Sequence, residues 1–278
     1  MANRKIAQTV RGQRAVDGAG VRLVRVLGGR NVTDFDPFLM LDSFDSTDPN
    51  DYIAGFPTHP HRGIETITYL IEGRIDHEDS MGNRDTIHAG ESQWMTAGSG
   101  ILHQEMPKAS ARMLGFQLWL NLARDEKMTE PKYLSITRDM MPLVEQGGAQ
   151  VRILSGSFGG VSGIKPNHIP ATILDVLIPA GGAITVPTAP GETAFVFLIE
   201  GDAVVGGEDI AEKTAALLSD GDAVDLAATA DAASRIIVFM GAPLREPIAW
   251  GGPIVMNTRA ELEAAFDELD RGTFIRHD

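Results

Sequence analysis

Residues 67–73 of the chain read Ile67-Thr68-Tyr69-Leu70-Ile71-Glu72-Gly73, and residues 194–201 read Ala194-Phe195-Val196-Phe197-Leu198-Ile199-Glu200-Gly201. Each stretch is a short apolar run, rich in β-branched and aromatic residues, that ends at a glycine, as a strand entering a turn does. The two stretches share the ending Leu-Ile-Glu-Gly at an offset of 128 residues (70 to 198), and Gly63 matches Gly191 at the same offset. This agreement predicts that one β-domain is duplicated in the chain.

Similar short runs recur along the chain and are separated by turn residues. The chain has 30 glycines and 15 prolines among its 278 residues, and one further run, residues 236–240, ends directly before Gly241. Many short strands with frequent glycine breaks are typical of an all-β sandwich or barrel. The length allows two medium domains or one large domain with a substantial core.

The last part of the chain differs, because it has the pattern of a helix. Thr258-Arg259-Ala260-Glu261 matches a capping box, and Leu262, Phe266 and Leu269 follow at helical spacing. Gly272 stands where a helix commonly ends. We expect this helix to pack its apolar side on a sheet in a structural role.

The composition argues against several classes of function. The chain has 24 Lys and Arg against 38 Asp and Glu, a formal net charge of −14, and no basic run that would bind a phosphate backbone. It has no cysteine, which excludes disulfides, thiolate metal sites and iron–sulfur clusters. No apolar run approaches the roughly 18 residues that span a bilayer, and no signal-peptide pattern follows the first residues. We therefore expect a cytoplasmic protein that binds neither nucleic acid nor a membrane directly.

Two segments carry side chains that bind metals. His59-Pro60-His61 and His103-Gln104-Glu105 each have two such side chains at positions i and i+2, in stretches with strand character. Alternate residues of a strand point to the same face, so each segment directs both side chains to one place. If the two strands are neighbours, they bring three imidazoles and one carboxylate together. The pattern predicts a divalent transition metal held by His59, His61, His103 and Glu105.

The ligand types narrow the choice of metal without fixing it. Imidazole and carboxylate groups suit iron, manganese, cobalt, nickel, copper or zinc, whereas calcium and magnesium prefer oxygen ligands. Four ligands would close a tetrahedral zinc site and make it structural. Octahedral Fe(II) would keep positions open for a substrate and dioxygen, so iron is the preferred assignment. Glu65 and Gln93 are candidates for orienting a ligand imidazole.

The remaining histidines and the second half of the chain have no such pattern. At the offset of 128 residues His59 becomes Pro187 and His61 becomes Ala189, so we expect a single metal site, in the first half. Four further histidines are isolated and are expected at the surface or in turns, although the first of them is one hairpin from the metal site: His77, His88, His168 and His277.

Three segments of the chain stand out as a possible family signature. They are Phe56-Pro57-Thr58-His59-Pro60-His61-Arg62-Gly63-Ile64-Glu65-Thr66, Gln93-Trp94-Met95-Thr96-Ala97-Gly98-Ser99-Gly100-Ile101-Leu102-His103-Gln104-Glu105-Met106-Pro107, and Gly252-Pro253-Ile254-Val255-Met256-Asn257-Thr258 with the helix after it. The first two are long and specific, and the three together cover both halves of the chain. They resemble the signature of the pirin family in the cupin superfamily.

The resemblance implies an all-β fold of two stacked cupin-type jelly-roll barrels with a C-terminal helix. It implies an N-terminal metal-binding barrel at residues 1–133 and a C-terminal barrel without metal ligands at residues 134–278. The family's iron ligands fall on four residues of this chain, and none is missing: His59, His61, His103 and Glu105.

The resemblance also implies two functions of different classes. Several pirins resemble quercetin 2,3-dioxygenases, so the chain is expected to cleave a flavonol-like aromatic substrate with dioxygen at an Fe(II)-type centre, with Glu105 as ligand and catalytic base. The alternative is a non-catalytic, metal- and redox-dependent regulator that binds a transcription factor or a metabolic enzyme. An open cavity beside the metal would favour the enzyme, and a buried metal beneath a flat charged surface would favour the regulator.

Overall fold

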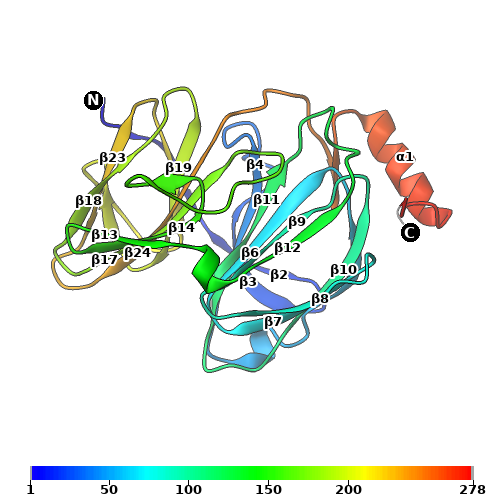
Figure 1. Cartoon of the computed structure of the whole chain (residues 1–278), viewed down its shortest axis with the longest axis horizontal. Coiled ribbons are helices and arrows are strands. Elements are labelled where there is room, and N and C mark those ends of the chain that lie inside the picture. The colour runs from blue at the N-terminus through cyan, green and yellow to red at the C-terminus, as the bar shows by residue number, and fades with distance from the viewer. Residues whose placement is uncertain (1, 277–278) are drawn as a thin grey trace. The chain divides into compact units, whose positions relative to one another are not determined.

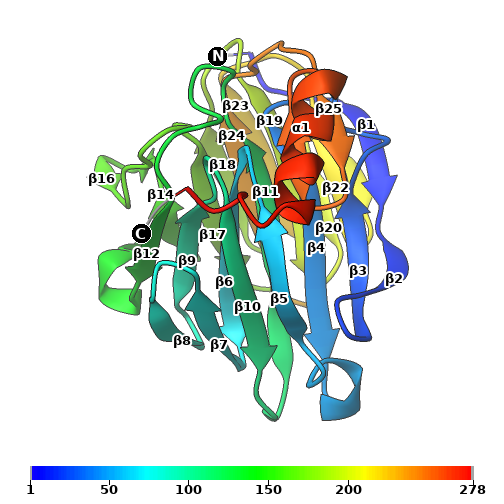
Figure 2. The same cartoon turned by 90° about the vertical axis from the view of Figure 1, so that its right-hand side faces the viewer.

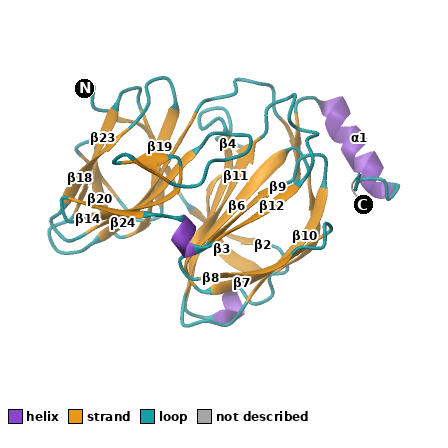
Figure 3. Ribbon diagram, in the orientation of Figure 1, coloured by secondary structure: helices purple, strands orange, loops and turns teal. Residues whose placement is uncertain are grey.

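The computed structural model describes residues 2–276, which form many strands and, at the C-terminal end, one α-helix (Figure 1 and Figure 3). The prediction of an all-β fold with a C-terminal helix is therefore confirmed. The chain divides into two compact units, and each unit contains a seven-stranded sheet and a four-stranded sheet. Within the described residues no helix has the length and apolar character needed to cross a membrane.

The unit that carries the predicted ligands is named the histidine unit, and it comprises Arg14–Arg30, Phe38–Thr137 and Leu244–Asp278. Its larger sheet has the order β12 (Lys132–Ile136), β9 (Ser92–Thr96), β6 (Ile64–Glu72), β11 (Met113–Asn121), β4 (Phe38–Ser46), β3 (Val21–Leu27) and β2 (Gln13–Asp17). Its smaller sheet has the order β5 (Phe56–His61), β10 (Ile101–Pro107), β7 (Arg74–Asp79) and β8 (Arg84–His88). In Figure 1 β7 and β8 lie beneath β6 and β12, and β10 lies to the right of β9 and β12. Apolar side chains from both sheets pack together as one cluster: Val21, Leu23, Phe44, Tyr52, Leu70, Ile75, Ile87 and Met113.

The other unit is named the apolar unit, and it comprises Met1–Gln13, Asn31–Pro37 and Arg138–Pro243. Its larger sheet has the order β1 (Ile6–Arg11), β22 (Thr214–Leu218), β19 (Thr193–Glu200), β24 (Ser234–Gly241), β17 (Thr172–Ile178), β14 (Ala149–Ser155) and β13 (Leu143–Gln146). Its smaller sheet has the order β18 (Ala183–Pro187), β23 (Ala223–Ala228), β20 (Ala203–Val205) and β21 (Glu208–Ile210). The remaining elements of the two units are two pairs of short strands, two 3₁₀ turns and the α-helix: β15 (Ser157–Phe158), β16 (Val161–Ser162), β25 (Ala249–Gly251), β26 (Ile254–Met256), η1 (Pro49–Asp51), η2 (Arg138–Met140) and α1 (Arg259–Asp270).

The repeated Leu-Ile-Glu-Gly sequence lies at the same point of both units. It ends β6 in the histidine unit and β19 in the apolar unit, each near the middle of its larger sheet. Gly73 and Gly201 follow these strands with φ of 102° and 73°, a conformation that favours glycine. The shared sequence is thus the strand-to-turn step of a repeated structural unit, which agrees with duplication.

At both ends of the chain the units differ from the expected division at residues 133 and 134, and Asn31–Pro37 also belongs to the apolar unit. The N-terminal strand β1 belongs to the apolar unit, because it pairs with β22 along the edge of that unit's larger sheet. The C-terminal segment belongs to the histidine unit, because Ile254 forms a bridge with Arg62 and α1 packs on β25 and β26. Both differences arise from pairing between segments that are far apart in the sequence.

The C-terminal helix starts as its sequence predicts. The Thr258 side chain accepts a hydrogen bond from the Glu261 backbone N–H, and the Glu261 carboxylate accepts one from the Thr258 backbone N–H. These reciprocal bonds satisfy N–H groups that have no partner within the helix. The apolar side packs as expected, with Leu262 and Leu269 against Ile254 and its neighbours, although Phe266 remains 38% exposed.

Candidate metal centre

Neighbouring strands of the smaller sheet bring three predicted ligands together. β5 and β10 are antiparallel and adjacent (Figure 2), and their register places His103 opposite His59. His61 is two residues from His59 and shares its strand face. One ring nitrogen of each of these three histidines lies within 4.8 Å of the others. The structure therefore assembles a three-histidine cluster.

A glycine turn leads the chain into the second ligand strand. Gly98 and Gly100 have φ of 49° and 137°, and they precede β10 directly. A Cβ on Gly98 would lie 2.2 Å from the carbonyl oxygen of Thr129, so this close backbone approach requires glycine. The turn sets the point at which β10 begins, and so the position of His103.

The hydrogen bonds of His59 and His61 orient both rings toward a common point. The Nδ1 atoms lie 2.9 Å from the Pro57 carbonyl oxygen and 3.0 Å from the Pro253 carbonyl oxygen, respectively. A carbonyl oxygen only accepts, so the donor of each ring is Nδ1–H, and in the neutral form of the ring Nε2 then has a lone pair. The two Nε2 atoms are 3.1 Å apart. Two lone pairs at that distance cannot bond to each other, whereas a cation between them would satisfy both.

Burial keeps two of the rings neutral. Burial, followed by the neighbouring His59, lowers the pKa of His61 to about 3. Burial also lowers the pKa of His103 well below its ordinary value, and both of its ring nitrogens lack a hydrogen-bond partner among the described residues. Unpaired buried nitrogens are costly in a protein interior. Neutral imidazoles with free nitrogens are the form in which histidine binds a metal, so the cluster fits a transition-metal ion.

Glu105 reaches the same interior but lies apart from the histidine cluster. Among the described residues, the group of candidate ligands within 4.8 Å of one another contains the three histidines and not Glu105. The carboxylate is 2% exposed, and its oxygens accept hydrogen bonds from three side chains that we name the carboxylate cradle: Thr68 at 2.9 Å, Gln93 at 2.5 Å and Gln117 at 2.5 Å. The carboxylate cradle therefore holds the Glu105 carboxylate in a fixed position in the interior of the histidine unit.

The two predicted orienting residues have different positions. Gln93 does contact a predicted ligand, but it bonds to the carboxylate of Glu105 instead of to an imidazole. Thr66 and Thr68 on β6 share the face of the sheet that carries Gln93. Glu65 directly precedes Thr66, so its side chain points to the opposite face, where it accepts a hydrogen bond from Thr96.

His77 corrects the expectation for the isolated histidines. It is 2% exposed, and the register pairs it with Glu105, so it faces the interior and not the surface. Its ring centroid lies 5.4 Å from that of His103 and 4.3 Å from that of Tyr133, and its Nε2 is 3.1 Å from Asp79. His88 is exposed and His168 lies in a bend, as expected, while His277 is outside the described residues.

The cradle belongs to a polar row that crosses the inner face of the larger sheet. Its members are paired in register across five adjacent strands: Asp42, Gln117, Thr68, Gln93 and Ser135. Sequence reasoning missed Thr68, Gln117 and Tyr133, whose hydroxyl donates to Gln93. A single glutamine within the otherwise apolar run 113–120 of β11 is a signal that could have identified the row.

An open cleft leads to the histidines. It has a volume of about 590 Å³, and both His59 and His61 line it. Apolar and aromatic side chains form much of its wall: Met40, Phe56, Pro57, Trp119, Trp250 and Pro253. A small molecule can therefore reach the cluster from solvent, which is the feature expected of an enzyme site.

Among the described residues, the corresponding strands of the apolar unit contain no cluster of candidate metal ligands. The two ligand strands β5 and β10 match β18 and β23 in the order of the smaller sheets. The inward-facing positions there belong to the hydrophobic core: Ile184, Val186, Val224, Leu226 and Ala228. Within residues 2–276 the only cluster of candidate ligands is the one in the histidine unit.

Comparison with known proteins gives consistent matches over both units. Residues 20–120 match the Pirin family model, and residues 173–275 match the model of the pirin C-terminal cupin domain. A pirin-like protein of Caulobacter vibrioides is 42% identical over 99% of this chain and 100% of its own length. The crystal structure of quercetin 2,3-dioxygenase from Acinetobacter baumannii superposes with a TM-score of 0.90 and 32% identity, over 98% of this chain and 99% of that one. A bacterial pirin of Escherichia coli, crystallised with nickel(II), has a TM-score of 0.64 at 22% identity, over 85% of this chain and 98% of its own, and shows the same fold.

Proposed function

The chain belongs to the pirin family, and from that premise we propose that it is a metal-dependent dioxygenase that cleaves a flavonol such as quercetin. One observation carries the proposal: a cleft of about 590 Å³ opens directly onto two of the three clustered imidazoles. A regulator would not need such an opening. The similarity to a quercetin 2,3-dioxygenase of Acinetobacter baumannii supports the choice of reaction.

His59, His61 and His103 would hold one divalent metal ion, with Fe(II) as the first choice and manganese, cobalt, nickel, copper or zinc as the others. When bound, such an ion would supply a Lewis acid for a substrate hydroxyl and, as Fe(II), a one-electron relay between dioxygen and the flavonol, which itself supplies the electrons. The carbonyl oxygens of Pro57 and Pro253 would orient two of the ligand rings through their Nδ1–H groups.

Glu105 would be the fourth ligand and the catalytic base. Its carboxylate is buried in the same interior as the histidines, and the carboxylate cradle holds both of its oxygens. A movement of the side chain toward the histidines would bring one oxygen to the cluster while the cradle keeps the other. In that position Glu105 would take the proton of the substrate hydroxyl.

The cleft walls suit a flat aromatic substrate. The ring centroids of Trp119 and Trp250 lie 5.8 Å apart at 37°, and both rings line the cleft with Phe56. Aromatic rings offer large apolar faces for stacking, and they exclude water from a bound substrate. A flavonol, with its fused planar rings and one hydroxyl at the metal end, matches this combination.

An aerobic assay with quercetin tests the proposal. Metal-free protein is loaded with Fe(II), and the loss of flavonol absorbance is followed together with the release of carbon monoxide. We expect the two signals to rise together in the wild type and to vanish in His103→Gln. No turnover with iron, manganese, cobalt, nickel or copper would contradict the proposal, and would favour the non-catalytic regulator.

A further inference from the structure

One side of the cleft carries a charged group that the proposed chemistry does not use. We name it the charged trio: Asp17, Arg25 and Asp42, all of which line the cleft. Arg25 Nε and Nη2 donate to the two carboxylate oxygens of Asp42 at 2.9 and 2.6 Å, and Nη2 also donates to Asp17 at 2.6 Å. The two-point bond to Asp42 fixes the plane of the guanidinium.

The trio is built to present one donor to the cleft. The Asp42 side chain is only 5% exposed, so it anchors Arg25 from within the barrel, whereas Arg25 is 35% exposed. The bonds of Arg25 use Nε and Nη2, and within residues 2–276 no partner takes Nη1. Asp17 is 48% exposed, and its Oδ2 lies beside the same guanidinium. A donor without a partner and an acceptor are thus beside each other on two residues that line the cleft.

We infer that the charged trio recognises a neutral phenolic hydroxyl of the substrate other than the hydroxyl that meets the metal. A hydroxyl both donates and accepts, so it can donate to Asp17 and accept from Arg25 Nη1 at once. A carboxylate could only accept, and it would meet one cation paired with two anions. The trio therefore selects a hydroxylated aromatic ring and rejects an aromatic acid. This inference rests on the proposed function, because it takes the imidazoles to bind the other end of the same substrate.

The position of the trio relative to the histidines supports a single ligand. Asp17 and His59 are near enough to interact electrostatically, and both line the same cleft. The aromatic rings of Trp119 and Trp250 belong to that lining as well. A planar ligand stacked on these rings can place one end at the imidazoles and a ring hydroxyl at the trio.

The test measures binding without turnover. Zinc-loaded protein, in which the metal cannot change its oxidation state, is titrated by calorimetry with quercetin, with 3-hydroxyflavone and with 3-hydroxyflavone that carries a carboxylate on its phenyl ring. 3-Hydroxyflavone has the metal-end hydroxyl but no further ring hydroxyls. We expect quercetin to bind about tenfold tighter than 3-hydroxyflavone, and the carboxylated compound to bind more weakly than both.

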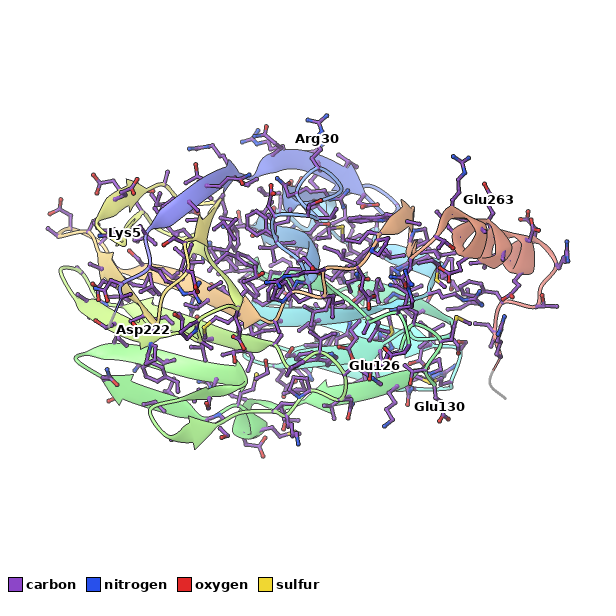
Figure 4. All side chains as sticks on the ribbon, turned by 90° about the horizontal axis from the view of Figure 1, so that it is seen from above. Lys5, Arg30, Glu126, Glu130, Asp222 and Glu263 are labelled. Atoms are coloured by element: carbon purple, nitrogen blue, oxygen red, sulfur yellow. The ribbon has the colours of Figure 1, made fainter. Side chains whose placement is uncertain are left out.

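Two variants assign the preference to the trio. Asp17→Asn removes the acceptor charge from an exposed position, and Arg25→Lys keeps a cation for Asp42 but loses the Nη1 donor. We expect each to reduce the preference for quercetin to about twofold with an unchanged affinity for 3-hydroxyflavone. Asp17→Asn should also strengthen binding of the carboxylated compound, an effect that a structural role would not produce. Glu263→Gln is the matched control, because it removes an exposed carboxylate paired with an arginine on α1, outside the cleft (Figure 4).

The possible outcomes separate the two proposals. Equal affinities for quercetin and 3-hydroxyflavone in the wild type, or tightest binding of the carboxylated compound, would overturn the role of the trio and leave the proposed function standing. Failure of all three compounds to bind would overturn both. If Arg25→Lys does not fold, as judged by its thermal unfolding, Asp17→Asn decides alone.

Discussion

Glu105→Gln should weaken metal binding more than any other single loss of charge in the barrel. The carboxylate is 2% exposed, and the three side chains of the carboxylate cradle that bond to it are neutral. Its negative charge is therefore available to a cation in the histidine cluster. Two unit charges 4 Å apart interact by about 4 kcal/mol at an effective dielectric constant of about 20, which corresponds to about a thousandfold in affinity.

The assay is a competition titration of metal-free protein with a chromophoric chelator, carried out with zinc and, without oxygen, with Fe(II). We expect one metal ion per chain in the wild type and in Glu105→Gln, with the dissociation constant raised about a thousandfold in the variant. Gln93→Leu keeps the charge but removes one cradle donor, and it should weaken binding by about 10- to 100-fold.

Glu65→Gln is the matched control for this prediction. Glu65 is 0% exposed and lies on β6 with Thr68, but its side chain points to the other face of the sheet. It should bind metal within about threefold of the wild type. An equally small effect of Glu105→Gln would refute the assignment of Glu105 as a ligand. A variant that kept both metal and full turnover of quercetin would also refute its role as the base.

Three further predictions concern the fold and the cleft. The buried Lys127 ammonium donates to three neutral oxygens, and burial lowers its pKa from 10.5 to about 8. Between these pH values the unfolded state binds more protons than the folded state. The free energy of unfolding of the wild type should therefore rise with pH by up to about 3 kcal/mol relative to that of Lys127→Met. Urea titrations at both pH values measure this difference in unfolding free energy, and a difference that stays constant or falls with pH would contradict the prediction. Trp250→Ala removes a ring whose centroid lies 5.8 Å from that of Trp119. Calorimetry should show that the affinity for quercetin falls about tenfold and that the affinity for the metal is unchanged. Loss of metal binding instead would place the ring in the metal site. Arg62→Met removes a guanidinium that is 2% exposed and pairs with Glu268 on α1 at 2.8 Å. The change should lower the free energy of unfolding by about 3 kcal/mol and expose the helix to proteolysis. A loss of unfolding free energy below about 1 kcal/mol would show that the ion pair is dispensable.

The sequence predicted those parts of the fold that depend on neighbouring residues. The Leu-Ile-Glu-Gly repeat and the capping box at Thr258 are local patterns, and each has the expected structure. The unit boundaries were not predictable in this way. Pairing of β1 with β22 and bridging of Ile254 to Arg62 join segments about 200 residues apart, and no local pattern records such contacts.

The same distinction holds for the candidate site. His59 and His61 are two residues apart on one strand, so strand geometry alone brings their rings to one face, and the second ligand strand proved to be adjacent. The groups around Glu105 come instead from strands β6, β9 and β11, and only the register of the sheet aligns them. His77 was misjudged for this reason, because its burial follows from its pairing with Glu105 and not from its own neighbours.

We expect one metal ion among His59, His61 and His103 of the histidine unit. Crystals of the metal-loaded protein, measured at the absorption edge of the metal, test this directly by anomalous diffraction. One anomalous peak per chain is expected, about 2.0–2.3 Å from one nitrogen of each of the three rings and from a carboxylate oxygen of Glu105. A peak in the apolar unit, or a metal ion held without His103, would contradict it.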